Sequence, residues 1–80
     1  MESLLEDKLE SIYNNDLIFN VNYVGKDKEK IYNIYVLLNI GAKYDFEFTY
    51  KFDDYFTLDY NIDRLRNIID VKLIKLFHRY

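Results

Sequence analysis

The chain has 80 residues, of which 50% are hydrophobic and 19% aromatic, with a net charge of −3 and no cysteine. This composition excludes a disordered chain, a disulfide framework and a thiolate zinc site. No apolar run approaches the ~18 residues that cross a bilayer, and the first residues are acidic where a secretion signal would be basic. We therefore expect one compact domain over residues 1–80, located in the cytoplasm and without a membrane partner.

The first predicted element is a helix over residues 3–14. Ser3 and Glu6 have the spacing of a capping box, in which the two side chains accept hydrogen bonds from free amides of the first turn. Apolar residues then recur at helical spacing, at Leu5, Leu9 and Ile12. This pattern predicts a helix with one face turned to a core.

Two strands are predicted next, over residues 17–24 and 31–40. In the first, the odd-numbered residues are apolar and predict an inward face, while in the second the even-numbered face is apolar throughout. Gly25 opens a charged turn between these strands, and residues 39–42, which include Gly41, give a tight connection to the segment that follows.

The third predicted strand, residues 44–52, alternates an aromatic ring with a polar residue over nine positions. The alternation predicts five rings on the core side, from Tyr44, Phe46, Phe48, Tyr50 and Phe52. It also places Asp45 and Glu47 on the opposite, outer face. Three strands joined by short turns predict an antiparallel meander.

Residues 53–60 break the alternation and favour a loop over a short edge strand. A second helix is predicted from a cap at Asp59 or Asn61 to the end of the chain, with a wide apolar stripe. The predicted fold class is therefore α+β, with the order helix, three-stranded antiparallel meander, helix. Both helices are expected to cover the same face of the sheet.

Catalytic and metal-binding chemistry has little support in the sequence. His78 is the only histidine, and Ser3 and Ser11 both lie in the first helix, so no nucleophile–base pair can be assembled. Asp53, Asp54 and the nearby Asp59 lack the alternating oxygen ligands and central glycine of a calcium loop. We expect no enzymatic activity, no cofactor and no metal.

The order of elements is also that of the double-stranded RNA-binding domain. That family has a lysine-rich start to its second helix, whereas this helix begins Asn61-Ile62-Asp63-Arg64. Direct nucleic-acid binding is therefore the less favoured alternative. A small nucleic-acid-binding regulator would use the basic residues Lys26, Lys28, Lys30, Arg64, Arg66, Lys72, Lys75 and Arg79.

Recognition of another protein is the favoured function. Ile18, Tyr35 and Leu37 are predicted on the outer sheet face next to the strand that carries Asp45 and Glu47, and tyrosine is enriched at interfaces. The predicted contact residues are Tyr35, Asp45, Glu47, Asp53, Asp54, Tyr55 and Asp59. Residues 1–24 and 44–60 each hold five acids against one lysine. If these acidic blocks met on one side, their carboxylates could mimic the phosphates of nucleic acid.

A compact acidic chain of this length, with a helix, a three-stranded antiparallel sheet and a helical end, resembles small phage-encoded inhibitors of bacterial defence, including anti-CRISPR proteins. The resemblance lies in architecture and composition, without a motif. It implies a larger protein partner, such as a host nuclease or CRISPR effector, whose nucleic-acid-binding or regulatory surface is occupied. An antitoxin or immunity protein would have the same composition, and both a monomer and a homodimer are open.

Overall fold

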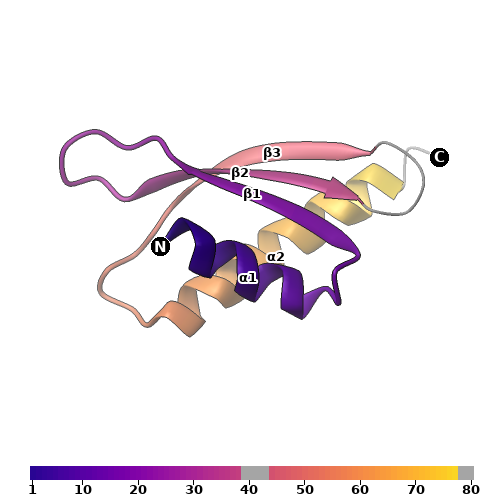
Figure 1. Cartoon of the computed structure of the whole chain (residues 1–80), viewed down its shortest axis with the longest axis horizontal. Coiled ribbons are helices and arrows are strands. Elements are labelled where there is room, and N and C mark those ends of the chain that lie inside the picture. Colours follow the sequence, from indigo (N-terminus) through magenta and orange to yellow (C-terminus); the bar gives the residue numbers. More distant parts are fainter. Residues whose placement is uncertain (39–43, 78–80) are drawn as a thin grey trace.

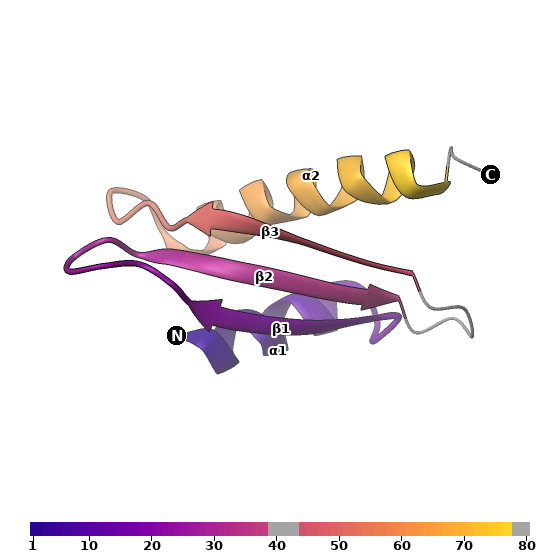
Figure 2. The ribbon, with the colours of Figure 1, turned by 90° about the horizontal axis from the view of Figure 1, so that it is seen from above.

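Three antiparallel strands form a sheet that is backed by two helices on one face. The computed structural model describes residues 1–38 and 44–77. The elements are α1 (Glu2–Ile12), β1 (Leu17–Tyr23), β2 (Ile31–Leu38), β3 (Asp45–Lys51) and α2 (Leu58–Phe77). The strands lie in the order β1-β2-β3 (Figures 1 and 2). The predicted α+β fold with a meander between two helices is confirmed.

The register places the alternating apolar residues of neighbouring strands side by side. Phe19 pairs with Val36, and Val36 pairs in turn with Phe46. The predicted inward faces of β1 and β2 are confirmed, because Leu17, Phe19 and Val21 are buried, as are the even-numbered residues of β2. Burial of these residues against the helices is the main stabilising contribution to such a fold.

The aromatic strand contributes fewer buried rings than the alternation predicted. Tyr50 and Phe52 are buried, whereas Tyr44, Phe46 and Phe48 are partly buried and pack against the core. The inner face is therefore closed at one end of β3 and incompletely covered at the other. The Nζ atom of Lys72, on α2, lies 5.5 Å from the ring centroid of Phe48. An aliphatic lysine stem covers an aromatic ring less completely than a branched apolar side chain would.

The two predicted helix starts are wrong in detail. Met1 is the N-cap of α1 without a side-chain capping bond, so Ser3 and Glu6 do not form a capping box. The second helix starts at Leu58, before the predicted caps, because the Thr57 hydroxyl accepts a hydrogen bond from the backbone N–H of Tyr60 at 3.1 Å. Thr57 thus satisfies an amide that the first turn of α2 leaves free.

The loop predicted over residues 53–60 is confirmed over residues 53–57, and α2 takes up the rest of the predicted segment. At the other end of the sheet, Asn14 and Asn15 end α1 with φ angles of 53° and 62°, a conformation that asparagine adopts more readily than most residues. The predicted connection at residues 39–42 and the predicted helical residues His78 and Arg79 lie outside the described residues.

Both helices lie below the sheet in Figure 1, and Figure 2 looks onto the opposite face, with the strands in front of α1. The molecule therefore has two layers, with the core between them. Among residues 1–38 and 44–77, no element covers the face of the sheet that points away from the helices. We call this face the outer sheet face.

Candidate functional site

The outer sheet face carries polar, carboxylate and apolar side chains in rows across the three strands. The rows follow from the register. They are Ile18, Leu37 and Asp45; Asn20, Tyr35 and Glu47; and Asn22, Asn33 and Thr49. Three of the predicted contact residues, Tyr35, Asp45 and Glu47, are thus brought together on one exposed surface.

Hydrogen bonds between β2 and β3 hold the two carboxylates of this face in position. The Tyr35 hydroxyl donates to Oδ2 of Asp45 at 2.6 Å, and Nδ2 of Asn33 donates to Oε2 of Glu47 at 3.2 Å. The hydrogen bond to Asp45 raises the pKa of the Tyr35 phenol, because the bond favours the protonated hydroxyl. Each carboxylate is anchored through one oxygen.

An apolar pair lies next to the carboxylates. Ile18 is directly opposite Leu37 across β1 and β2, and its side chain is 43% exposed. Leu37 is in turn opposite Asp45. A partner that binds at Ile18, Leu37 and Asp45 would therefore bury aliphatic surface and contact a negative charge beside it.

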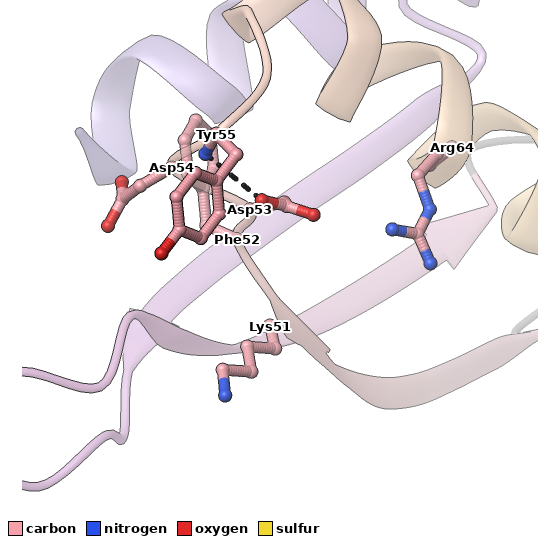
Figure 3. Close-up of a pocket in the computed structure, with 6 residues that line it drawn as sticks. All are labelled: Lys51, Phe52, Asp53, Asp54, Tyr55 and Arg64. Carbon is pink, nitrogen blue, oxygen red and sulfur yellow. Dashed lines mark hydrogen bonds between the residues drawn. The ribbon is translucent and has the colours of Figure 1, made fainter.

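A second group of predicted contact residues lies beyond the end of β3, in the loop shown in Figure 3. Tyr55 is 96% exposed, and its backbone N–H donates to Oδ1 of Asp53 at 3.0 Å. Asp54 forms an ion pair with Lys30, with 2.8 Å between Oδ1 and Nζ. Asp53, Asp54 and Tyr55 border a surface hollow of about 450 Å³ that is also lined by Lys51, Phe52 and Arg64.

The charges around this hollow are mixed. The ion pair with Asp54 raises the pKa of Lys30, and Lys51 and Arg64 line the hollow together with Asp53. Asp59 is exposed in the first turn of α2, where a carboxylate interacts favourably with the helix dipole. The predicted contact residues therefore fall into two separate groups and an outlying Asp59, with basic residues between them.

The acidic residues of α1 have a role that the sequence did not reveal. Three glutamates accept hydrogen bonds from backbone N–H groups of β1: Oε2 of Glu10 from Phe19 at 3.2 Å, Oε2 of Glu6 from Val21 at 2.7 Å and Oε2 of Glu2 from Tyr23 at 3.1 Å. We call this set the glutamate ladder. These hydrogen bonds hold three of the five acids of residues 1–24 against β1. The two acidic blocks therefore do not form one strip of free carboxylates.

The glutamate ladder forms because one helical repeat along α1 has nearly the same length as one strand repeat along β1. Four helical residues rise about 6.0 Å, and two strand residues advance by about 6.6 Å. The Val24 N–H donates to Ile31 O at 2.9 Å, so the even-numbered residues of β1 turn their backbone groups toward β2 and the odd-numbered ones face outward. The four-residue spacing of Glu2, Glu6 and Glu10 was the available signal, but the same spacing is common on solvent-exposed helix faces.

A second element that sequence reasoning missed is the buried side chain of Asn61. Its Oδ1 accepts hydrogen bonds from the Tyr50 hydroxyl at 2.6 Å and from the Asp53 N–H at 2.9 Å. Its Nδ2 donates to the carbonyl oxygens of Asp53 at 3.0 Å and Thr57 at 2.9 Å. All the hydrogen-bonding capacity of this amide is used, so Asn61 ties β3, the loop and α2 together.

The described part of the chain holds no group of three or more metal-ligating side chains. Within it, no helix is long and apolar enough to cross a bilayer. Two of the basic residues considered for nucleic-acid binding contact rings of β3, since Arg64 lies 5.9 Å from the Tyr50 ring centroid and Lys72 contacts Phe48.

Comparisons with protein-family models, with curated proteins and with solved structures found no match to this chain.

Proposed function

We propose that this protein is a non-enzymatic binding protein that occupies a surface of a larger protein through its outer sheet face. One observation carries the proposal: an uncovered sheet face holds Asp45 and Glu47 in place through Tyr35 and Asn33, next to the apolar Ile18. Tyrosine together with apolar and charged groups is typical of the centre and rim of a protein interface.

Preorganisation supports this use of the face. Binding usually costs side-chain entropy, because flexible groups become fixed at the interface. Here the Asp45 carboxylate is already held by a 2.6 Å hydrogen bond that joins β2 and β3. The strands beneath are rigid elements compared with a loop. A partner would therefore meet carboxylates whose positions are largely set before association.

The chemistry of the face favours a basic partner surface. Asp45 and Glu47 supply negative charge beside the Ile18–Leu37 pair, and such charge speeds and directs association with a positive surface. Proteins that hold nucleic acid present such surfaces. We propose an inhibitor of phage or mobile-element origin that blocks a host nuclease or CRISPR effector, with carboxylates competing for contacts that phosphates would make.

Affinity capture from a nuclease-treated bacterial lysate tests this function. The tagged wild-type chain is compared with a variant that carries both Asp45→Lys and Glu47→Lys. Asp63→Lys is the control, because Asp63 is exposed on α2, away from the outer sheet face. A nucleic-acid-processing protein that is retained by the wild type and by the control, lost with the double variant and inhibited by the purified wild type supports the proposal.

Equal retention by all three chains would contradict the proposed face. In a parallel capture from untreated lysate, recovery of nucleic acid alone would contradict the proposed function and favour the nucleic-acid-binding alternative. Both outcomes are read by mass spectrometry and by nucleic-acid staining of the same eluates.

A further inference from the structure

Helix α2 carries acidic and basic side chains on different flanks. The Tyr13 hydroxyl donates to Oδ1 of Asp70, which places Asp70 on the flank toward α1. The flank toward β3 holds three basic side chains, those of Arg64, Lys72 and Lys75. Among residues 1–38 and 44–77, none of these three forms an ion pair. Their charges are therefore available to an anionic ligand.

The basic flank of α2 lies against rings of β3 that are only partly buried. Helix and strand run side by side in Figures 1 and 2. The Nζ atom of Lys72 lies 5.5 Å from the ring centroid of Phe48, and Phe48 stacks with Phe46 at 6.4 Å between centroids. A hollow of about 240 Å³ opens beside them and is lined by Asp45, Phe46, Lys72, Lys75 and Leu76. This part of the surface combines aromatic groups with two ammonium groups.

The same combination continues toward the start of α2. The guanidinium carbon of Arg64 lies 5.9 Å from the ring centroid of Tyr50 and 6.0 Å from that of Tyr60. Tyr60 stacks with Phe56 at 4.2 Å between ring centroids. Phe56 is 50% exposed and Tyr60 is 40% exposed. Aromatic surface is therefore open to solvent beside the third cation.

These cations and rings form one strip along the side of the molecule. We call it the basic-aromatic strip and define it by Arg64, Lys72, Lys75, Phe46, Phe48, Phe56 and Tyr60. From Tyr60 to Lys75 the helix rises by about 22 Å. Carboxylates border the two ends, where Asp45 lines one hollow and Asp53 lines the other. Like-charge repulsion at both ends would direct an anion to the cations between them.

A single-stranded nucleic acid has the chemistry that fits this strip. Its phosphates attract cations, and its unpaired bases pack on aromatic rings. A duplex offers mainly phosphates, because its bases are stacked inside, and three cations are few for phosphate contacts alone. An acidic peptide would pair with the cations but would bring no flat surface to Phe56 and Tyr60.

We propose that the basic-aromatic strip binds a short single strand of DNA or RNA. The phosphates lie at Arg64, Lys72 and Lys75, and bases pack on Phe56 and Tyr60. This inference goes beyond the proposed function, because the strip lies between β3 and α2, whereas the proposed protein partner contacts the outer sheet face. A chain with both surfaces would recover a protein and nucleic acid together from untreated lysate.

Fluorescence anisotropy with labelled oligonucleotides tests the strip on the purified chain. The probes are an oligothymidylate and an oligouridylate of about 15 nucleotides, within the range of single-strand site sizes. We expect the wild type to bind both at low salt, because the strip recognises phosphates and base faces that DNA and RNA share. Three phosphate contacts predict a slope of about −2 when the logarithm of the association constant is plotted against that of the salt concentration.

Two double variants with the same loss of charge test the cations. Arg64→Gln with Lys75→Gln should weaken binding at low salt by about tenfold or more and reduce the slope to about −0.7. The control is Lys28→Gln with Arg66→Gln. Lys28 lies in the loop between β1 and β2, and Arg66 lines a hollow with Asp70 on the other flank of α2. This control should keep nearly the wild-type affinity and slope.

The rings are tested separately from the charges. Phe56→Leu with Tyr60→Leu keeps apolar side chains but removes the flat faces, so binding of oligothymidylate should weaken by about tenfold or more. Binding of an abasic strand of the same length, which has phosphates without bases, should not change. Tyr23→Leu, at an exposed ring at the end of β1, should bind like the wild type. Circular dichroism confirms the native fold of each variant.

A wild-type chain that binds neither probe at low salt overturns the proposal. So does equal binding of the oligothymidylate and the abasic strand, or tighter binding of a duplex than of either single strand. Polyglutamate that displaces the probe as well as unlabelled oligothymidylate does would identify an acidic peptide as the occupant instead. None of these results depends on the target protein, so failure of the strip is distinguishable from failure of the proposed function.

Discussion

At the scale of single residues, the strongest stability prediction concerns Asn61. Replacement by alanine leaves the Tyr50 hydroxyl and the Asp53 N–H without their partner in a buried site. The carbonyl oxygens of Asp53 and Thr57 lose one of their two donors and keep the backbone N–H groups of Phe56 and residue 61. Unpaired buried groups cost about 1 to 3 kcal/mol each, so we expect Asn61→Ala to lower the free energy of unfolding by about 3 kcal/mol. Denaturant unfolding followed by circular dichroism measures this loss.

The control for Asn61 is Asn67→Ala on the same helix. Asn67 is exposed, so this substitution should change the free energy of unfolding by about 0.5 kcal/mol or less. Similar losses in the two variants would mean that the buried amide does not hold the loop to α2.

Tyr13 predicts a pH dependence at the residue scale. Its hydroxyl donates to Oδ1 of Asp70 at 2.6 Å, and burial and then this bond raise its pKa. The neutral phenol is thus favoured in the folded chain. The contribution of the Tyr13 phenol to the free energy of unfolding is fully present below its pKa in the unfolded chain, about 10. That contribution is lost as the pH rises through the higher pKa of the phenol in the folded chain.

Tyr13→Phe checks this dependence, because phenylalanine keeps the ring without an ionisable group. At pH 8 the variant should be less stable than the wild type by about 1 kcal/mol, the worth of one hydrogen bond. Above pH 10 the difference should shrink. Parallel stability curves for the two proteins across the alkaline range would contradict the role given to Tyr13.

At the scale of elements, the glutamate ladder makes α1 the cover of an open strand edge. Glu6 accepts a 2.7 Å hydrogen bond from Val21 at the middle of β1. Glu6→Ala leaves this amide unpaired in a partly buried site, so we expect a loss of about 1 to 2 kcal/mol in the free energy of unfolding. Asp7→Ala, at an exposed neighbouring position, should have a much smaller effect.

Amide hydrogen exchange gives a second measurement of the same element. In Glu6→Ala the Val21 amide should exchange faster than in the wild type, while the Ile34 amide inside the sheet should stay protected. Unchanged protection of Val21 would mean that the ladder does not stabilise the β1 edge.

The elements themselves were predictable because their signals are local. The alternation of apolar residues predicted the inward faces of β1 and β2, and the helical spacing of apolar residues predicted the burial of Leu5 and Leu9. The caps were not predictable to the residue, because Ser3, Asp59 and Thr57 are all reasonable caps in sequence. Which one is used depends on how the neighbouring loop packs.

The contacts that join distant elements could not be predicted from local pattern. Glu6 and Val21 come into contact only when α1 lies along β1. The Asn61 side chain becomes buried and fully hydrogen-bonded only when the loop after β3 folds over it. For the site, alternation correctly placed Asp45 and Glu47 on the outer face. The ion pair between Asp54 and Lys30 forms only in the tertiary fold, so the strand pattern did not predict it.

At the scale of the whole molecule, both helices lie on one face of the sheet, and no element among residues 1–38 and 44–77 covers the other face. The proposed partner uses this outer sheet face. Asp45 points its side chain onto this face, where the Tyr35 hydroxyl donates a hydrogen bond to it.

The central claim is that the outer sheet face binds a basic surface of another protein. Its most direct test is the dissociation constant of the captured target for the wild type, for the chain with Asp45→Lys and Glu47→Lys, and for Asp63→Lys, at low and high salt. We expect the double variant to bind at least about a hundredfold more weakly at low salt, with the gap narrowing at high salt. The Asp63→Lys control should bind like the wild type. Equal affinities for all three chains at low salt would contradict the account.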